Sequence, residues 1–315
     1  MFQAQKTEQA IKERTEMYKK HVVESKTLQL TYFSKQKITC PACGAEFPRE
    51  ELLSGSGRLL AGELTDELRR TYTPSQKYGR VYPLVYSIGV CPQCFLALFW
   101  NDFTALDKTL AEPFCETSQE RFDIVKGIFP YFDFKHNRTL IDGAAAHYLA
   151  LLCYEKLPAA KYSTTMRRAM LTLRLAWISN DLHEVCPDRN YDYIASVFYQ
   201  KAMFFYNEAV RKESNGEERI GNIGSYGPDL DKNYGFDGCV YLTALLDYKY
   251  GQKENLEARL KSLDEHKRSL ARMFGLGKSS KAKPGPLLEH SRDLYDKLTA
   301  ELKAANALNE DDDDE

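Results

Sequence analysis

The sequence predicts an α+β protein that is mostly α-helical, with a small β module built around four cysteines and an array of α-helical hairpins behind it. Two observations predict this fold class. Two Cys-Pro-x-Cys pairs, Cys40–Cys43 and Cys91–Cys94, each follow a segment with strand character. From about residue 117 onwards, apolar residues recur at three- and four-residue steps, which is the spacing of amphipathic helices.

The composition excludes several classes of protein. The chain has 315 residues, of which 43% are hydrophobic and 28% charged, so it is neither collagen-like, wholly disordered nor membrane-embedded. It has no signal-peptide h-region and no apolar stretch of membrane-spanning length, so we expect a cytoplasmic protein without a membrane partner. Thiols stay reduced in the cytoplasm, so the eight cysteines point to metal ligands or redox groups rather than to disulfides.

The N-terminal part is expected to contain a helix and then a strand. Residues 1–26 are rich in Lys, Glu and Gln with few apolar positions, which predicts a surface helix with a narrow apolar stripe. From Thr27 the period changes, because Leu28, Leu30 and Tyr32 alternate with polar residues. We expect a half-buried strand that continues to Ile38 and leads into Cys40.

The segment between the two cysteine pairs is expected to form a helical insertion and a second strand. Leu60, Leu64 and Leu68 stand at i, i+4 and i+8, which predicts one face of a short helix. A tyrosine-rich loop, residues 72–80, follows it. Residues 81–90 are rich in β-branched and aromatic side chains, so we expect a strand that leads into Cys91.

The four cysteines carry the strongest chemical signal in the sequence. Each C-x-x-C places two thiolates on one tight turn, and two such turns supply the four soft ligands that tetrahedral Zn(II) prefers. We therefore predict one structural zinc ion bound by Cys40, Cys43, Cys91 and Cys94 in a zinc-ribbon-like module covering residues 27–116. Gly44 suits the position after a knuckle, where φ is often positive, and Phe95 at the same place predicts that the two turns differ.

Two other interpretations of these cysteines stay open at this stage. C-P-x-C also occurs in thioredoxin-like proteins, where it opens a helix after a strand, so a dithiol redox site is an alternative. The other interpretation is that the spacing of these four cysteines is a coincidence. Four more cysteines, Cys115, Cys153, Cys186 and Cys239, are isolated in the sequence, and we expect them to be small buried hydrophobic residues.

Residues 117–306 are expected to form helical hairpins similar to tetratricopeptide repeats. Residues 241–251 place Leu and Tyr on one helix, Ala at a close approach and Gly at the turn, and residues 253–263 supply the second helix. Residues 173–177, with Ala195, Ala202 and Ala209 on the next helix, form a looser copy. The last residues, 307–315, end in six acidic side chains and predict a disordered tail.

The functional expectation is a non-enzymatic adaptor that binds a protein partner through its helical surface. No nucleotide-binding, metalloprotease or nucleophile-elbow motif occurs in the sequence. The alternative is a nucleic-acid-binding protein that uses a basic and aromatic set in the insertion: Arg69, Arg70, Lys77 and Arg80 with Tyr72, Tyr78 and Tyr82. A dithiol redox protein is the third hypothesis.

Both cysteine pairs and the helical tail together resemble a bacterial family, domain-of-unknown-function family 2225. The resemblance covers about Lys37 to Leu263. Besides the four cysteines, its specific residues here are Asn101-Asp102-Phe103 and Leu175-Ala176-Trp177. Phe95 stands where the family commonly has Gly. The resemblance implies a bacterial cytoplasmic protein that contains zinc and a helical repeat, and it implies no activity, substrate or partner.

Overall fold

The computed structural model describes residues 30–312 apart from residues 54, 56, 231 and 275–283. The helix expected over residues 1–26 lies outside the described residues. The contacts divide the chain into two compact units, and each unit is assembled from segments that are not consecutive in the sequence. Unit 1 comprises the described residues up to Glu63 together with Thr71–Leu157 and Arg174–Ser196. Unit 2 comprises Leu64–Arg70, Pro158–Leu173 and the chain from Val197 onwards.

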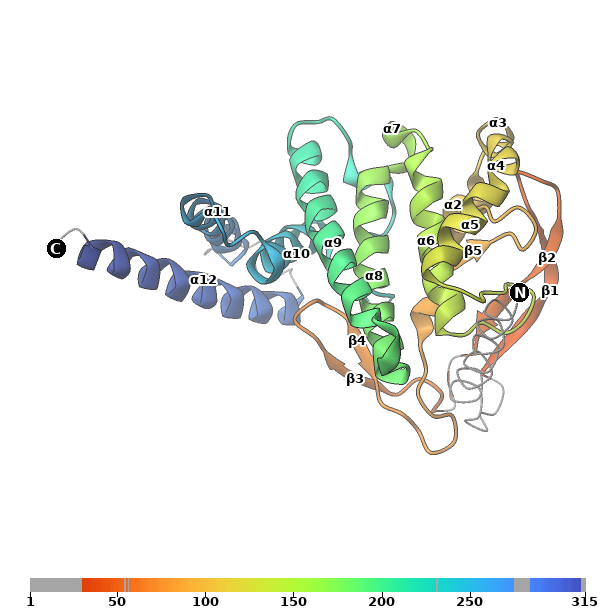
Figure 1. Ribbon diagram of the computed structural model, residues 1–315, viewed down its shortest axis with the longest axis horizontal. Coiled ribbons are helices and arrows are strands. Elements are labelled where there is room, and N and C mark those ends of the chain that lie inside the picture. The colour runs from red at the N-terminus through yellow and green to blue at the C-terminus, as the bar shows by residue number, and fades with distance from the viewer. Residues whose placement is uncertain (1–29, 54, 56, 231, 275–283, 313–315) are drawn as a thin grey trace, which may run out of the picture. The chain divides into compact units, whose positions relative to one another are not determined.

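Unit 1 contains two antiparallel hairpins. In the first, β1 (Thr31–Thr39) pairs with β2 (Glu46–Leu52), and Thr39 faces Glu46 next to the turn (Figure 1). In the second, β5 (Ile88–Val90) pairs with β6 (Ala97–Phe99), and Val90 faces Ala97. The strand expected to run into Cys40 is therefore present, beginning at Thr31.

One long helix, α6 (Leu140–Glu155), forms the centre of unit 1. It contacts β5, β6 and the 3-10 helix η1 (Pro83–Tyr86), as well as α5 (Ser118–Ile128). Nearly all of its side chains are buried, as expected of a helix that is apolar all round. Its N-terminus has a capping box, in which Thr139 and Asp142 satisfy each other's backbone N–H groups.

Shorter elements complete unit 1. They are the helices α2 (Trp100–Ala105), α3 (Lys108–Ala111) and α4 (Pro113–Glu116), the 3-10 helix η2 (Pro187–Arg189), the last part of α8 (Thr164–Val185) and the first part of α9 (Tyr191–Ser214). In α8, Leu175, Ala176 and Trp177 are buried, and the Arg174 guanidinium lies over the Phe99 ring at 5.2 Å.

Unit 2 is helical. Besides its parts of α8 and α9 it contains α7 (Ala159–Tyr162), η3 (Ile220–Asn222), α10 (Gly235–Tyr250), α11 (Leu256–Met273) and α12 (Gly285–Asp312). Helices α10, α11 and α12 contact one another, and Figure 1 shows α11 beside α12. The Asn255 side chain caps α11 by accepting a hydrogen bond from the Ala258 N–H. Helix pairs are thus present, whereas a tetratricopeptide arrangement of them stays a prediction.

The helix expected over Leu60, Leu64 and Leu68 is wrong. The segment forms a two-stranded sheet of β3 (Ala61–Leu64) and β4 (Arg70–Tyr72), closed by a turn in which the Thr65 N–H donates to the Arg69 carbonyl. Leu68 has a left-handed backbone with φ of 59° and is fully buried. Tertiary burial of this leucine therefore overrides the leucine spacing.

Part of that insertion belongs to the core of unit 2. The Lys249 ammonium pairs with Asp66 at 2.9 Å and with Glu67 at 3.0 Å. The Tyr199 hydroxyl donates to Glu67, and the Tyr241 hydroxyl donates to the Asp66 carbonyl. These contacts determine the conformation of residues 64–70, and nothing in the local sequence pattern indicates them.

Two further expectations need correction. The strand expected over residues 81–90 is limited to Ile88–Val90, because Pro83 has no N–H for a sheet ladder and instead begins the 3-10 helix η1. Helix α12 continues to Asp312, so the acidic run is not wholly a disordered tail, since the alanine- and leucine-rich residues before it favour helix. Among the described residues, no helix has the length and apolar character that crossing a bilayer requires.

Close packing of α6 against η1 leads to a prediction. A Cβ on Gly143 would lie 2.7 Å from Val85 Cγ2 and 3.1 Å from the Val85 Cα. We expect Gly143→Ala to reduce the free energy of unfolding by about 1–3 kcal/mol, because α6 must move away from η1. Urea unfolding followed by circular dichroism measures the change.

Gly127→Ala is the matched control for this substitution. Gly127 lies in α5 with no atom near its added Cβ. Alanine there should leave the stability unchanged or increase it by up to about 1 kcal/mol, since alanine favours helix over glycine. Equal effects of the two substitutions would contradict the packing described for α6.

Candidate metal centre

The two cysteine pairs occupy equivalent positions in the two hairpins of unit 1. Cys40 and Cys43 lie in the turn that joins β1 to β2. Cys91 and Cys94 lie in the turn that joins β5 to β6. The chain therefore presents two thiols at the end of each hairpin, as a zinc-ribbon-like module requires.

The backbones of the two turns make the same hydrogen bonds. In the first turn, the Gly44 N–H donates to the Cys40 carbonyl at 2.9 Å. In the second, the Phe95 N–H donates to the Cys91 carbonyl at 3.0 Å. Both residues have positive φ, 74° for Gly44 and 56° for Phe95. The expectation that Phe95 makes the two turns differ is wrong, because the phenylalanine adopts the conformation that glycine adopts in the other turn.

Ring packing explains how Phe95 tolerates this conformation. A left-handed backbone costs a residue with a Cβ about 1–2 kcal/mol. The Phe95 ring lies 5.1 Å from the Phe122 ring and 6.1 Å from the Phe132 ring, measured between centroids. Aromatic pairs at such distances contribute about 0.5–1.5 kcal/mol each beyond the area that they bury. The packing thus offsets the backbone strain.

The four sulfur atoms converge on one point. The Sγ atoms of Cys40, Cys43, Cys91 and Cys94 all lie within 4.8 Å of one another. The Cys40–Cys94 and Cys43–Cys91 pairs are each separated by 3.6 Å. Four sulfurs at about 2.3 Å from a tetrahedral zinc ion would be about 3.8 Å apart. These separations fit a metal ion, whereas a disulfide would need about 2.05 Å.

The four thiols also compete for protons. Hydrogen bonds from Cys91 and Cys94 lower the pKa of Cys40, and the same bonds to Cys40 raise the pKa of Cys91 and Cys94. Ionisation of the Cys40 thiol is therefore favoured, and ionisation of the Cys91 and Cys94 thiols is disfavoured. A divalent cation removes this conflict because it stabilises all four thiolates, so binding of the ion releases protons.

The site is closed as far as the described residues show. Cys40, Cys91 and Cys94 are buried and Cys43 is half-buried. Within the described residues, no other group of His, Cys, Asp or Glu side chains is arranged to hold a metal ion. Four protein ligands complete a tetrahedron and leave no position for water or substrate. The arrangement can hold a metal ion, although its identity does not follow from the geometry.

The residues that follow the second hairpin support it. Phe103 is fully buried, and its ring makes edge contacts with Phe47 at 5.9 Å and with Trp100 at 6.0 Å. The Tyr154 hydroxyl donates to the Asp102 carboxylate and accepts a hydrogen bond from the Phe99 N–H. Asp102 and Phe103 of the Asn-Asp-Phe motif thus serve packing and polar satisfaction around the hairpin.

Sequence reasoning missed two residues at this centre. Cys115, expected to be an isolated hydrophobic residue, is half-exposed. Burial raises the pKa of its thiol, the nearby Cys43 and Cys40 sulfurs raise it further, and a hydrogen bond with Cys94 opposes them. Arg121 donates a hydrogen bond to the Cys94 carbonyl at 2.7 Å. Neither residue stands at a ligand-like spacing from the cysteine pairs, so no local pattern identifies it.

Part of the basic and aromatic set of the insertion makes contacts within the protein. Tyr78, expected to stack on bases, is only 3% exposed, and the Arg58 guanidinium and the Lys77 ammonium lie over its ring. Arg80 forms an ion pair with Glu184. Tyr78, Lys77 and Arg80 of this set are thereby engaged within the protein.

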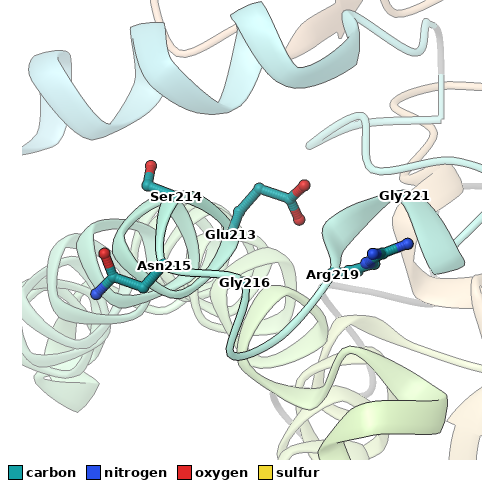
Figure 2. Close-up of a pocket in the computed structure, with 6 residues that line it drawn as sticks. All are labelled: Glu213, Ser214, Asn215, Gly216, Arg219 and Gly221. Carbon is teal, nitrogen blue, oxygen red and sulfur yellow. The ribbon is translucent and has the colours of Figure 1, made fainter.

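Unit 2 has a depression of about 770 Å³ at the end of α9 (Figure 2). Its lining residues are mostly exposed: Glu213, Ser214, Asn215, Gly216, Arg219 and Gly221. The Glu213 carboxylate accepts a hydrogen bond from the Ile220 N–H, so this acidic group already has a partner. The depression offers no constellation of reactive groups.

The left-handed conformation of Phe95 leads to a second prediction. Phe95→Ala loses the ring contacts and keeps the backbone strain, whereas Phe95→Gly loses the contacts and relieves the strain. We expect both variants to be less stable than the wild type by about 1–3 kcal/mol, with Gly about 1 kcal/mol more stable than Ala. Urea unfolding of the metal-loaded protein tests this order, and Ala at least as stable as Gly would contradict it.

Comparisons with known proteins place this centre within a family match. The family described as "Uncharacterized protein conserved in bacteria (DUF2225)" matches residues 33–298, a range that includes all four cysteines. A protein of Borreliella burgdorferi, named "Uncharacterized protein", is 41% identical over 275 residues, covering 87% of this chain and 98% of that protein. No solved structure matches the chain. The match over most of the chain establishes that this protein belongs to the bacterial DUF2225 family.

Proposed function

We propose that this protein is a non-enzymatic adaptor, in which one structural Zn(II) ion joins the two hairpins of unit 1 and the helical surface binds a protein partner. The convergence of Cys40, Cys43, Cys91 and Cys94 within 4.8 Å carries the metal part of the proposal. Thiolates select zinc over harder cations such as Mg²⁺ and Ca²⁺. A zinc ion with four thiolate ligands holds structure and does not activate water.

An exposed aromatic side chain supports the partner part of the proposal. Phe204 on α9 is 57% exposed, and its ring makes an edge contact with Phe205 at 5.2 Å. The Arg168 guanidinium lies over the Phe205 ring at 4.3 Å. Aromatic and arginine side chains are the residues that contribute most often to protein–protein binding energy. Hairpins of tetratricopeptide type would present such a surface to a peptide.

The other two hypotheses receive less support from the geometry. Burial of Tyr78 and pairing of Arg80 with Glu184 remove stacking and phosphate-binding groups from the proposed nucleic-acid surface. Cys91–Cys94 is followed by strand β6, whereas a thioredoxin-like C-P-x-C opens a helix. A protein partner is therefore the function that these observations favour.

The zinc proposal predicts a metal-dependent unit 1. We expect one zinc ion per wild-type chain and well below one for Cys91→Ser, because three thiolates no longer complete the tetrahedron. In small zinc modules, metal binding supplies about 10 kcal/mol or more of folding free energy. Cys91→Ser should therefore make unit 1 sensitive to proteolysis, while α10, α11 and α12 of unit 2 stay protected. Native mass spectrometry and limited proteolysis measure both effects.

Cys186→Ser is the matched control. Cys186 is half-exposed and lies outside the four-cysteine cluster, so its substitution should change neither the metal content nor the protease resistance. A wild-type chain that contains no metal and keeps unit 1 folded would contradict the zinc proposal.

The adaptor proposal predicts that Phe204 binds the partner. Phe204→Asp should abolish co-purification of a defined protein from the native cell, because a carboxylate cannot enter an apolar interface without a large desolvation cost. The complex should withstand a rise in salt from 50 to 200 mM, whereas nucleic-acid binding would fall steeply over that range.

Leu256→Asp is the control for this substitution. Leu256 is 53% exposed at the start of α11, so the same charge is introduced on another helix at similar exposure. We expect Leu256→Asp to retain the partner. Retention of the partner by Phe204→Asp, or co-purification of nucleic acid that is lost with salt, would contradict the proposed surface.

A further inference from the structure

Arg121 is a buried arginine that lies against the second cysteine turn. Arg121 belongs to α5 and is only 5% exposed. One terminal nitrogen donates to the Cys94 carbonyl at 2.7 Å and to the Phe114 carbonyl at 2.5 Å. The other donates to the Thr117 hydroxyl at 2.5 Å, and the guanidinium lies 5.2 Å from the Phe114 ring centroid. The guanidinium is thus held by several contacts.

None of these partners carries a negative charge. Within the described residues, no carboxylate lies within ion-pair distance of Arg121, and its buried Nε has no hydrogen-bond partner. Buried arginines are normally paired, because removing a cation from water is costly unless an opposite charge compensates it. A compensating charge must therefore be sought among the other groups near Arg121.

The four-cysteine cluster supplies that charge when it holds a metal ion. Four thiolates and one divalent ion carry a formal charge of −2, and this step rests on the zinc site proposed above. A carbonyl oxygen and the Sγ of the same cysteine lie at most about 5 Å apart. Since the guanidinium is 2.7 Å from the Cys94 carbonyl oxygen, it lies within about 8 Å of the Cys94 sulfur. Over that distance a buried charge is only weakly screened by salt.

We propose that Arg121 is a positioning residue of the metal centre, which balances the negative charge of the metal–thiolate cluster and holds the Cys94 carbonyl of the second turn in place. The hydrogen bonds to Thr117 and Phe114 fix the guanidinium before metal binds, so the cation is present without rearrangement. Arg121 coordinates no metal and acts through Cys94.

The test compares zinc affinity in two variants of the full chain. Arg121→Gln keeps a hydrogen-bond donor and removes the charge, and Arg121→Lys keeps the charge and loses the planar geometry. Changes to groups around first ligands typically weaken metal binding 10- to 100-fold. We expect a weakening of about that size for Arg121→Gln, with Arg121→Lys recovering most of it. Competition with a chromophoric zinc chelator measures both affinities.

Arg138→Gln is the control for loss of a half-buried arginine elsewhere in unit 1. Arg138 donates to the Val85 and Ile88 carbonyls and faces Glu50 and Asp142. We expect this variant to lose stability and to bind zinc with wild-type affinity. Circular dichroism of each zinc-loaded variant verifies that the proteins compared are folded.

Iron substitution gives a second readout that a purely structural role would not change. Four thiolates give Fe(III) a site charge of −1 and Fe(II) a site charge of −2, so a nearby cation favours the reduced form. At an electrode, which supplies the electron, Arg121→Gln should therefore lower the midpoint potential relative to the wild type. Arg121→Lys and Arg138→Gln should leave it near the wild-type value.

The outcomes separate this inference from the proposed function. If Arg121→Gln and Arg121→Lys weaken zinc binding equally and neither shifts the potential, the charge-balancing role is overturned while the metal site stands. If Arg121→Gln binds zinc as tightly as the wild type does, the inference about Arg121 is overturned and the proposed zinc site is unaffected. A wild-type chain that binds neither zinc nor iron overturns the proposed function, and the inference with it.

Discussion

Unit 1 brings four sulfur atoms together from two turns that 47 residues separate. Closing a loop of this length costs conformational entropy, and a two-stranded hairpin is at best marginally stable on its own. A metal ion shared by both turns would offset these costs. Helix α6 then packs on β5 and β6, the strands of the second hairpin.

The parts of the fold that sequence predicted are those decided by local interactions. The strand before Cys40 and the helical character of the chain after about residue 117 appear as expected, because apolar periodicity reports which side of an element is buried. The helix expected at Leu64 and Leu68 failed for a different reason. Residues 64–70 are part of unit 2, where distant contacts such as the Lys249 ion pairs decide their backbone conformation.

The candidate site shows the same division between local and distant information. The clustering of all four cysteines was predictable, since the chemistry of two thiols on one turn is encoded within four residues. Arg121 was not, because it follows Cys94 by 27 positions and only folding brings it against that carbonyl. Phe95 combines local and distant information. Its left-handed backbone conformation is unfavourable for a residue with a side chain, and ring contacts with Phe122 and Phe132 compensate for the cost.

Charge balance links the closed geometry of the site to the kind of function that we propose. A catalytic zinc ion needs an open position and usually neutral histidine ligands, which leave enough positive charge on the metal to acidify water. Four thiolates do the opposite, because they reverse the charge of the centre and occupy every position. The buried Arg121, which we propose to balance this charge, would stabilise the bound metal and would not create reactivity. The chemistry of the centre is therefore that of a structural site, and the binding that we propose is assigned to exposed side chains such as Phe204.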